Sequence, residues 1–558
     1  MNTKISGHEA PVGKIFSDDF VFTIPLYQRP YSWEKEQAGE LLDDLLQALG
    51  VGSTPIEELN PYFLGSIVLI KEDAPPAEVV DGQQRLTTLV ILLAALRELA
   101  PKDEADELTG YIYEKAKKLS NIPDRFRLTV RNRDAEFFRD FIQKENGFKQ
   151  LKDMTAVLKD PQINMRKNAL HFLTKLENLP EDVRLRLAGF IVSRCFLIVV
   201  TTPDFDSAYR IFSILNDRGM NLSHADILKA QVIGKVSPKL EEQYSTEWEN
   251  CEEELGLESF RDLFGHIRMI YMRKKLAGTV LEEVRDNVKP AEKPMEFIDK
   301  VLVPMADAYG EILKASYKST KRADEINRVL GWLHRIDNAD WQPPAIFFFA
   351  RNHNDPDALL LFLTELERLA AGQMIYRAAV NDRISRYGLL IAAIESGKNL
   401  IAADSPLQLS DEERKWIREA LNGSIYGVSQ TRLFILLRLD EAVAAAGATY
   451  DRSVVTIEHV LPQTPAVGSK WLDWWPDAAV REASVHRLGN MALLDRRKNP
   501  QAQNFDFDRK KTEYFLRKGT TPFPLTSQVL AEVEWTPAVF ERRQNELFAK
   551  LCDIWRLK

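Results

Sequence analysis

Hydrophobic and polar positions follow two different periods along this chain, and the change of period divides it into three regions. From about residue 12 to residue 235, short β-like runs alternate with helix-like runs in which apolar residues recur about every three to four positions. The β-like runs are FVFTIPLY (20–27), YFLGSIVLI (62–70), AEVV (77–80) and FLIVVTT (196–202). This alternation predicts a mixed α and β domain over residues 1–235.

The helical period dominates the rest of the chain, with one interruption. Residues 236–425 are almost entirely helix-like and predict a helical connector. Residues 426–558 begin with a helix-like run and continue with the β-like VVTIEHVLP (454–462), a Trp-rich loop and a basic, Asn-containing tail. We therefore expect an α+β multidomain protein that is predominantly helical, with domains at 1–235, 236–425 and 426–558.

Composition places the chain among water-soluble globular proteins. A length of 558 residues predicts two to four domains, and 45% hydrophobic with 28% charged residues is typical of packed cores. The chain has no apolar run of about 18 residues, and its first residues lack the apolar segment of a signal peptide. We expect a cytoplasmic protein with no membrane partner. Cys195, Cys251 and Cys552 are too few and too scattered for a disulfide framework or a thiolate zinc site, which predicts buried thiols.

Charge is distributed unevenly. The net charge of −8 argues against a surface that binds nucleic acid throughout. One basic cluster consists of Arg125, Arg127, Arg131, Arg133 and Arg139. A second consists of Arg481, His486, Arg487, Arg496, Arg497, Lys498, Arg509, Lys510 and Lys511. Either cluster can neutralise phosphates locally, but for the first cluster ordinary ion pairs on solvated helix faces explain the pattern equally well.

The stretch DGQQR, residues 81–85, lies where a β-like run ends and a helix-like run begins. The first turn of a helix has unpaired backbone N–H groups and the positive end of the helix dipole, which suits a bound phosphate. A tight polar turn is the structural alternative. The chain contains no G-x-x-x-x-G-K-[ST] motif, so any nucleotide site here is not a P-loop.

The strongest chemical pattern lies near the C-terminus, between residues 457 and 511. Glu458 and His459 are adjacent on the β-like run, Asn490 follows in a Leu-Gly-Asn turn, and Asn499 and two lysines come after it. Phosphodiester hydrolysis requires a base to activate water, a cation to neutralise the developing charge, and a group to orient the base. Oxygen ligands without thiolates favour Mg²⁺ or Mn²⁺ over zinc.

These residues carry a family resemblance. Residues 457–511 resemble the H-x-x-P, Asn, Asn, Lys pattern of the C-terminal His-Me finger (HNH) nuclease domain of GmrSD-type modification-dependent restriction systems. The N-terminal region independently resembles the ParB-like domain of the same family. Its motifs occur in family order as IPLYQRPYSW (24–33), YFLGSIVL (62–69), DGQQRLTTL (81–89) and ILNDRGMNLSHADILKA (214–230). The resemblance implies a ParB-like α/β domain, a helical connector and a ββα-metal nuclease domain.

The resemblance implies specific roles at the C-terminal site. His459 is expected to be the general base, and Asn490 to fix the loop that orients it. Glu458 and Asn499 are the expected metal ligands, and Lys510 or Lys511 the contact to the phosphate. The alternatives are ordinary structural roles: a surface strand carboxylate for Glu458, a turn former for Asn490 and a satisfied core histidine for His459.

At the N-terminal site the resemblance implies binding and hydrolysis of a nucleoside triphosphate. Asp81 would be a metal or water partner, Gly82 would allow close backbone approach, and Arg85 would counter phosphate charge. Gln83 or Gln84 would position water or the ligand. An aromatic and polar cluster lines the same pocket, stacks on a base, or packs between strand and helix: Tyr27, Gln28, Arg29 and Trp33.

The sequence thus favours an anti-phage endonuclease that senses modified DNA through its N-terminal half and cuts with its C-terminal half. Nucleotide binding would regulate it, and the interpretation is compatible with a homo-oligomer. Two alternatives stay open: a ParB-like nucleotide- and DNA-binding regulator without catalysis, and a nuclease that acts on RNA.

Overall fold

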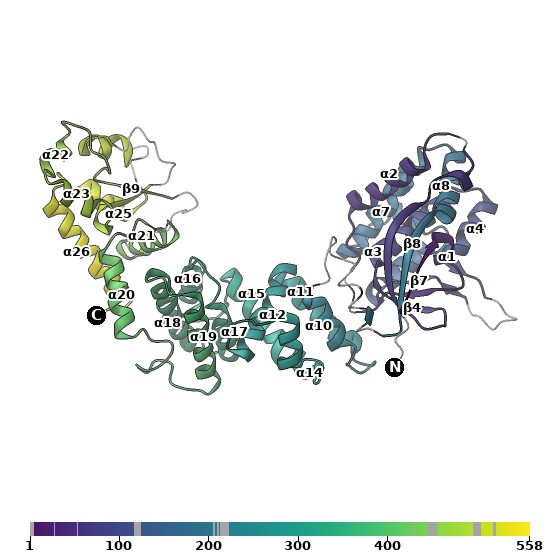
Figure 1. The fold of residues 1–558 in the computed structure, drawn as a ribbon, viewed down its shortest axis with the longest axis horizontal. Coiled ribbons are helices and arrows are strands. Elements are labelled where there is room, and N and C mark those ends of the chain that lie inside the picture. Colours follow the sequence, from purple (N-terminus) through teal and green to yellow (C-terminus); the bar gives the residue numbers. More distant parts are fainter. Residues whose placement is uncertain are drawn as a thin grey trace. The chain divides into compact units, whose positions relative to one another are not determined.

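The computed structural model describes residues 5–26, 28, 30–52, 54–116, 124–204, 207, 208, 211, 223–427, 429–444, 455–494, 504–516 and 521–558. The chain forms two compact units (Figure 1). Unit 1 comprises residues 1–248 and 290–295, and unit 2 comprises residues 249–289 and 296–558. Within the described residues, none of the helices has the length and apolar character needed to cross a membrane.

Unit 1 contains a six-stranded mixed sheet in the order β1-β8-β3-β4-β2-β7. The strands are β1 Ser6–Pro11, β8 Cys195–Thr202, β3 Tyr62–Ile70, β4 Pro76–Asp81, β2 Val21–Thr23 and β7 Leu128–Thr129. Strands β3 and β4 pair antiparallel, whereas β3 pairs parallel with β8 and β2 pairs parallel with β4. The four β-like runs of the N-terminal region are confirmed as β2, β3, β4 and β8.

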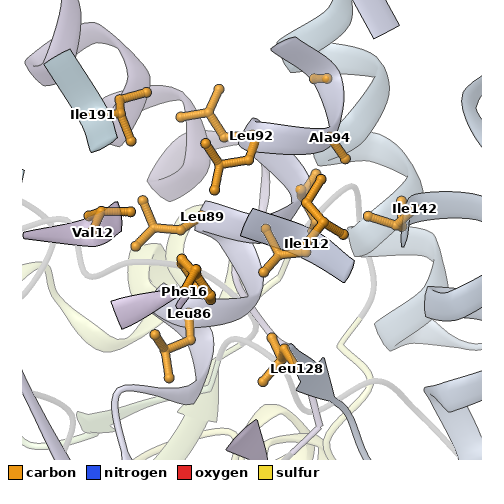
Figure 2. Packing of buried hydrophobic residues seen from close by; sticks show 14 of the residues in the cluster. Val12, Phe16, Leu86, Leu89, Leu92, Ala94, Ile112, Leu128, Ile142 and Ile191 are labelled. Atoms are coloured by element: carbon orange, nitrogen blue, oxygen red, sulfur yellow. The ribbon is translucent and has the colours of Figure 1, made fainter. Parts of the chain in front are cut away.

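Unit 1 also contains helices, and one of them, α3, follows β4 directly and packs against α4, α7 and α8. The helices are α1 Val12–Ile15, α2 Lys35–Leu49, α3 Gln83–Leu99, α4 Lys102–Ile112, α5 Asn132–Phe138, α6 Gly147–Lys152, α7 Asp160–Glu177, α8 Glu181–Arg194 and α10 His224–Ile233, and α11 Glu241–Leu255 crosses the boundary between the units. Every α3 residue from Leu86 to Arg97 is buried. Figure 2 shows Leu86, Leu89 and Leu92 of this helix amid apolar residues of other segments. The strand-to-helix junction is therefore anchored by one of the most deeply buried segments of the unit.

Unit 2 begins with helices. They are α12 Leu257–Met272, α13 Val280–Glu283, α15 Val303–Lys314, α16 Ala323–Leu333, α17 Gln342–Asn352, α18 Pro356–Ile375, α19 Val380–Glu395, α20 Asp411–Asn422 and α21 Ser429–Val443, with the short α14 Pro294–Phe297 at the unit boundary. The remaining elements are β9 Thr456–His459, α22 Lys470–Trp474, α23 Ala478–Val485, the 3-10 turn η6 Leu488–Asn490, β10 Met491–Leu494, α24 Phe507–Arg509, the π-helical turn η8 Lys510–Tyr514, α25 Pro524–Ala531 and α26 Pro537–Ile554. The predominantly helical α+β class is confirmed.

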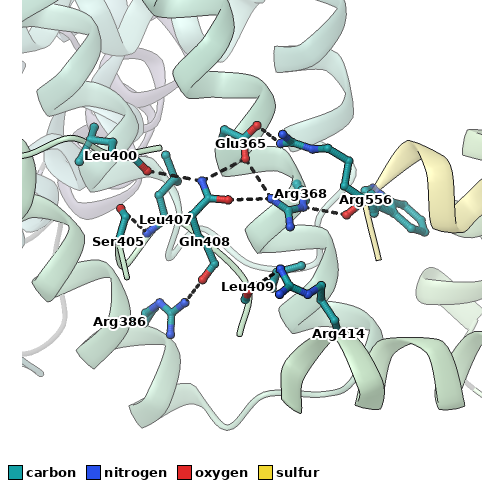
Figure 3. A network of polar contacts seen from close by, with 11 residues as sticks. Glu365, Arg368, Arg386, Leu400, Ser405, Leu407, Gln408, Leu409, Arg414 and Arg556 are labelled. Atoms are coloured by element: carbon teal, nitrogen blue, oxygen red, sulfur yellow. Dashed lines mark hydrogen bonds and ion pairs between the residues drawn. The ribbon is translucent and has the colours of Figure 1, made fainter. Parts of the chain in front are cut away.

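A buried polar network ties the end of α26 to the helical part of unit 2 (Figure 3). Arg368 of α18 donates to the carbonyl oxygen of Trp555 (2.7 Å), to Glu365 (3.0 Å) and to Gln408 Oε1 (2.9 Å). Glu365 also pairs with Arg556, beyond the end of α26. Because Arg368 and Glu365 are both buried, these paired charges fix α18 against the last helix of the chain.

Candidate functional site

The C-terminal candidate site is built on the two-stranded sheet of β9 and β10. The strands pair antiparallel, with His459 opposite Met491 and Glu458 opposite Ala492. His459 is the last residue of β9, so its imidazole lies where the strand passes into the loop of Val460 and Leu461. The His459 side chain is only 2% exposed.

Asn490 holds that loop by hydrogen bonds to its backbone. Its side-chain oxygen accepts from the N–H of Leu461 (2.7 Å), and its amide donates to the carbonyl oxygens of Leu461 (3.0 Å) and Val485 (2.9 Å). Its backbone oxygen accepts from the N–H of Val460 (2.9 Å). The side chain is fully buried, so these bonds set the backbone path directly after His459.

Lys510 holds the same loop from the other side. Its fully buried Nζ donates to the carbonyl oxygens of His459 (2.8 Å) and Val460 (3.1 Å). Lys511 donates to the carbonyl oxygen of Glu532 (2.6 Å). Both lysine side chains donate to backbone carbonyl oxygens here, with Lys510 fully buried and Lys511 half-buried.

Helix α26 supports the turn before β10. Arg543 donates to the carbonyl oxygens of Gly489 (2.6 Å) and Met491 (3.1 Å), and Gln544 accepts from the N–H of Gly489 (2.7 Å). Burial lowers the pKa of the Arg543 guanidinium to about 10, which leaves it charged at neutral pH. A Cβ at residue 489 would lie 3.0 Å from the Gln544 Cβ, so glycine permits this close approach.

Among the described residues, the His459 ring contacts the side chains of Gln463, His486 and Tyr426. Its Nδ1 lies 3.3 Å from the amide nitrogen of Gln463, and its Nε2 lies 3.1 Å from Nδ1 of His486. The ring of Tyr426 covers it, with a centroid separation of 4.4 Å. Tyr426 is fixed in turn by Arg432, whose guanidinium carbon lies 3.9 Å from the tyrosine ring centroid.

These contacts specify one arrangement of protons. An amide nitrogen only donates, so Nδ1 of His459 accepts from Gln463. The ring proton of neutral His459 then resides on Nε2 and is donated to Nδ1 of His486. His459 is thus oriented with Nδ1 as its basic nitrogen.

The residues that the sequence did not assign to the site are Gln463, His486 and Tyr426. Gln463 follows His459 by four residues, and His486 precedes Asn490 by four residues in the second basic cluster. Their spacing from the assigned residues was the available signal. Tyr426 belongs to the turn between α20 and α21, and only the tertiary structure brings it to His459.

Of the two expected metal ligands, only Glu458 lies within the described residues. Glu458 is 2% exposed, and its carboxylate oxygens accept from the N–H of His459 (2.9 Å) and the hydroxyl of Tyr514 (2.8 Å). Asn499 lies outside the described residues. Among the residues that are described, no group of three or more His, Cys, Asp and Glu side chains could hold a metal ion.

Arginines of the first basic cluster form ion pairs with nearby carboxylates. Arg127 pairs with Asp18 (2.7 Å) and Glu114 (3.3 Å), and Arg131 pairs with Asp134 (3.2 Å). Both arginines are buried, so these two members of the cluster do not face phosphates at the surface. Of the second cluster, Arg487 pairs with Glu541 and Arg509 with Glu513. Its members at 496–498 lie outside the described residues.

The N-terminal candidate site, residues 81–85, occupies the predicted strand-to-helix junction. Asp81 ends β4, and Gly82 precedes α3 in a left-handed conformation with φ of 90°. A Cβ at residue 82 would lie 2.5 Å from the Ile67 side chain, so the turn requires glycine. The geometry confirms a helix N-terminus at DGQQR.

Arg85 turns back from α3 onto β3. Its Nη1 donates to the carbonyl oxygen of Ser66 (2.8 Å), and its guanidinium packs over Gly65. Burial lowers the pKa of Arg85, and the nearby Asp81 carboxylate raises it in part. Arg85 and Asp81 therefore form a charged pair of neighbours at the junction.

The glutamines of this region differ in what they contact. Gln84 accepts from the N–H of Ser32 (2.9 Å) and donates to the carbonyl oxygen of Pro30 (2.9 Å), and buried Gln28 donates to the carbonyl oxygen of Val80 (2.8 Å). Both join the 24–33 motif to the DGQQR turn. Gln83 makes no side-chain hydrogen bond among the described residues. Tyr27, Arg29 and residues 214–222 of the fourth motif lie outside the described residues.

Two regions of the chain match models of known protein domains. Residues 12–233 match the model of the GmrSD restriction endonuclease N-terminal domain, and residues 411–550 match that of the C-terminal domain. Together the matches cover more than half of the chain. The uncharacterised protein MJ0686 of Methanocaldococcus jannaschii is 23% identical over 244 residues, which are 41% of each chain, so this chain spans less than half of that relative. The chain belongs to the GmrSD restriction endonuclease family.

Proposed function

We propose that this protein is a restriction endonuclease that hydrolyses phosphodiester bonds in DNA, with His459 as the general base. The observation that carries the proposal is the fixation of His459. Its backbone is held by Lys510 and, through the next two residues, by Asn490, and its ring is held by Gln463 and His486. A base fixed on both backbone and ring is preorganised for one proton transfer.

The proton arrangement defines what His459 does. Water loses a proton to Nδ1 of His459 as its oxygen attacks the phosphorus, while the bond from phosphorus to the leaving oxygen breaks and that oxygen takes a proton from solvent. That water must take the place of the Gln463 amide at Nδ1. Protonation at Nδ1 makes the ring cationic, which strengthens the Nε2–H bond to His486. His486 is therefore a positioning residue that favours the protonated state of the base.

We propose Mg²⁺ or Mn²⁺ as the cofactor, as the resemblance implies. A bound divalent ion would neutralise the charge that develops on the phosphate and on the leaving oxygen. The described residues do not assemble its ligands, because both oxygens of Glu458 accept hydrogen bonds from the protein. No step above depends on the ion.

We further propose that the DGQQR turn binds and hydrolyses a nucleoside triphosphate, and that unit 1 senses modified phage DNA. The support is the glycine-led N-terminus of α3, with Asp81 and Arg85 beside it. To reach a phosphate, Arg85 would need to release the carbonyl oxygen of Ser66 in β3. Nucleotide binding would therefore change a contact between α3 and the sheet.

One experiment tests the proposal as a whole. The purified chain is incubated with modified phage DNA, unmodified plasmid or RNA, with Mg²⁺ or EDTA, and with or without each nucleoside triphosphate. We expect cleavage of modified DNA that needs the metal and responds to one nucleotide, and no cleavage by His459→Ala. Nucleotide and DNA binding without cleavage under any condition would support the regulator instead, and preferential cutting of RNA would support the RNA nuclease.

A further inference from the structure

A cavity of about 690 Å³ lies in unit 2 next to the His459 site. Its walls come from the end of α18, from α20, from the turn at residues 423–425 and from the start of α21. None of the residues proposed above for catalysis lines it. The volume is within the range of pockets that hold small ligands.

An aromatic pair forms one wall. Trp416 of α20 is 43% exposed, which is unusual for a tryptophan. Its ring centroid lies 5.6 Å from that of Tyr376, whose hydroxyl donates to Glu413 (3.1 Å). Tyr376 is thus fixed, and Trp416 offers a supported aromatic face to the cavity.

The cavity also has a positively charged side chain, that of Arg377. Arg377 is exposed, and no described residue receives a hydrogen bond or forms an ion pair with its guanidinium. Its backbone has φ of 60°, a conformation that costs energy in a residue other than glycine. The carboxylate of Glu419, which also lines the cavity, lies 4.0 Å from Lys415.

One turn of chain connects a wall of the cavity to the catalytic site. Ser424 and Ile425 line the cavity, and the next residue is Tyr426, whose ring covers His459. A Cβ at Gly427 would lie 3.7 Å from the Arg377 guanidinium. The N–H of Ile425 also donates to the carbonyl oxygen of His486 (3.2 Å).

We infer that this cavity binds one unstacked nucleotide of the DNA strand that the His459 site cuts, with its base on Trp416 and its phosphate at Arg377. A base has a π-face that stacks on tryptophan whatever its identity, and an unpaired guanidinium suits a phosphate. The inference rests on the proposed nuclease function. It adds that the enzyme engages a flipped-out or single-stranded nucleotide next to the bond it cuts.

The test measures DNA binding in the His459→Ala protein, which cannot cut. The probes are a fluorescein-labelled oligonucleotide as single strand, as matched duplex and as duplex with one mismatch, with deoxycytidine monophosphate as competitor. We expect Trp416→Ala to weaken single-strand binding about tenfold, and Trp416→Phe to restore most of it. Arg377→Ala should lower the slope of log affinity against log salt by about one.

Matched controls separate this inference from general surface effects. Tyr271→Ala removes another aromatic residue of unit 2 that is 43% exposed, and Arg328→Ala removes another exposed arginine. Both should bind DNA like their parent. If the wild-type chain cleaves DNA but Trp416→Ala and Arg377→Ala bind DNA like the controls, the inference is overturned and the proposed function is not. Competition by the mononucleotide as strong as by the strand would show a free-nucleotide site and overturn it too. A wild-type chain that neither binds nor cuts DNA would instead overturn the proposed function.

Discussion

The two candidate sites use polar side chains in opposite ways. At the hairpin of β9 and β10, the buried polar residues Asn490 and Lys510 bind backbone, and the imidazole of His459 is presented to other titratable and aromatic side chains. At the DGQQR turn, Gln84 and Arg85 also bind backbone, but the turn presents the N-terminus of α3, with the Asp81 carboxylate near Arg85.

This difference separates two kinds of chemistry. A fixed, titratable ring can take up a proton, which is the requirement of hydrolysis. A helix N-terminus presents N–H groups and partial positive charge, which favour binding of an anion. We therefore expect the two sites to respond independently to substitution, and the following experiments test that expectation from the largest effect to the smallest.

His459→Ala should separate DNA cleavage from nucleotide turnover most clearly. Loss of a general base typically lowers the rate about 10² to 10⁴-fold, so cleavage of modified DNA should fall by that factor. Nucleotide turnover, measured by phosphate release, should stay at the wild-type rate. Unchanged cutting by a folded variant would remove His459 from the mechanism.

Substitutions in the DGQQR turn of unit 1 should have the reverse effect. Asp81→Ala or Arg85→Ala should lower nucleotide turnover by about 10²-fold, because each removes a charge beside the phosphate site. Circular dichroism and the unfolding transition of unit 2 should match the wild type. Turnover that survives in both variants would leave the DGQQR turn with a purely structural role.

Stability should also separate the two sites. Asn490→Ala leaves three buried backbone groups without their partner, which we expect to cost about 3 kcal/mol. Gln84→Ala removes two bonds from a partly exposed site and should cost about 1 kcal/mol. Hydrogen exchange read separately for the hairpin and for residues 30–32 measures both. Equal losses would contradict the different burial of the two amides.

The last effect concerns pH and unit 2 alone. Burial lowers the pKa of His266 from 6.5 to about 4 in the folded unit, so below pH 6.5 the unfolded chain takes up a proton first. Stability is therefore lost as the pH falls from 6.5 to about 4, by at most about 3 kcal/mol and less because the side chain is partly exposed.

Tryptophan fluorescence suits this measurement, because only Trp33 and Trp248 of the ten tryptophans belong to unit 1. His266→Gln should flatten the loss, whereas His8→Gln, which replaces an exposed histidine of β1, should leave it unchanged. An equal slope in both variants would assign the acid sensitivity to other groups.

Local pattern sufficed wherever a signal was carried by neighbouring residues. The apolar runs of β2, β3, β4 and β8, the helix after DGQQR and the strand carrying His459 were all predicted. Strand β1 was not, because its first four residues are exposed and it pairs with β8 without an apolar face. Strand β7 has two residues and gives no periodic signal.

By itself the sequence determined the family, the helix N-terminus at DGQQR and the loop role of Asn490, since each depends on residues close together in the chain. Only the tertiary structure decided that Lys510 is buried against the carbonyl oxygens of His459 and Val460, that Arg85 lies on β3, and that Tyr426 and His486 surround His459. A charged residue reads the same in sequence whether it faces a phosphate or a buried carbonyl. Which of the two it meets depends on packing between segments far apart in the chain, and that is fixed by the fold as a whole.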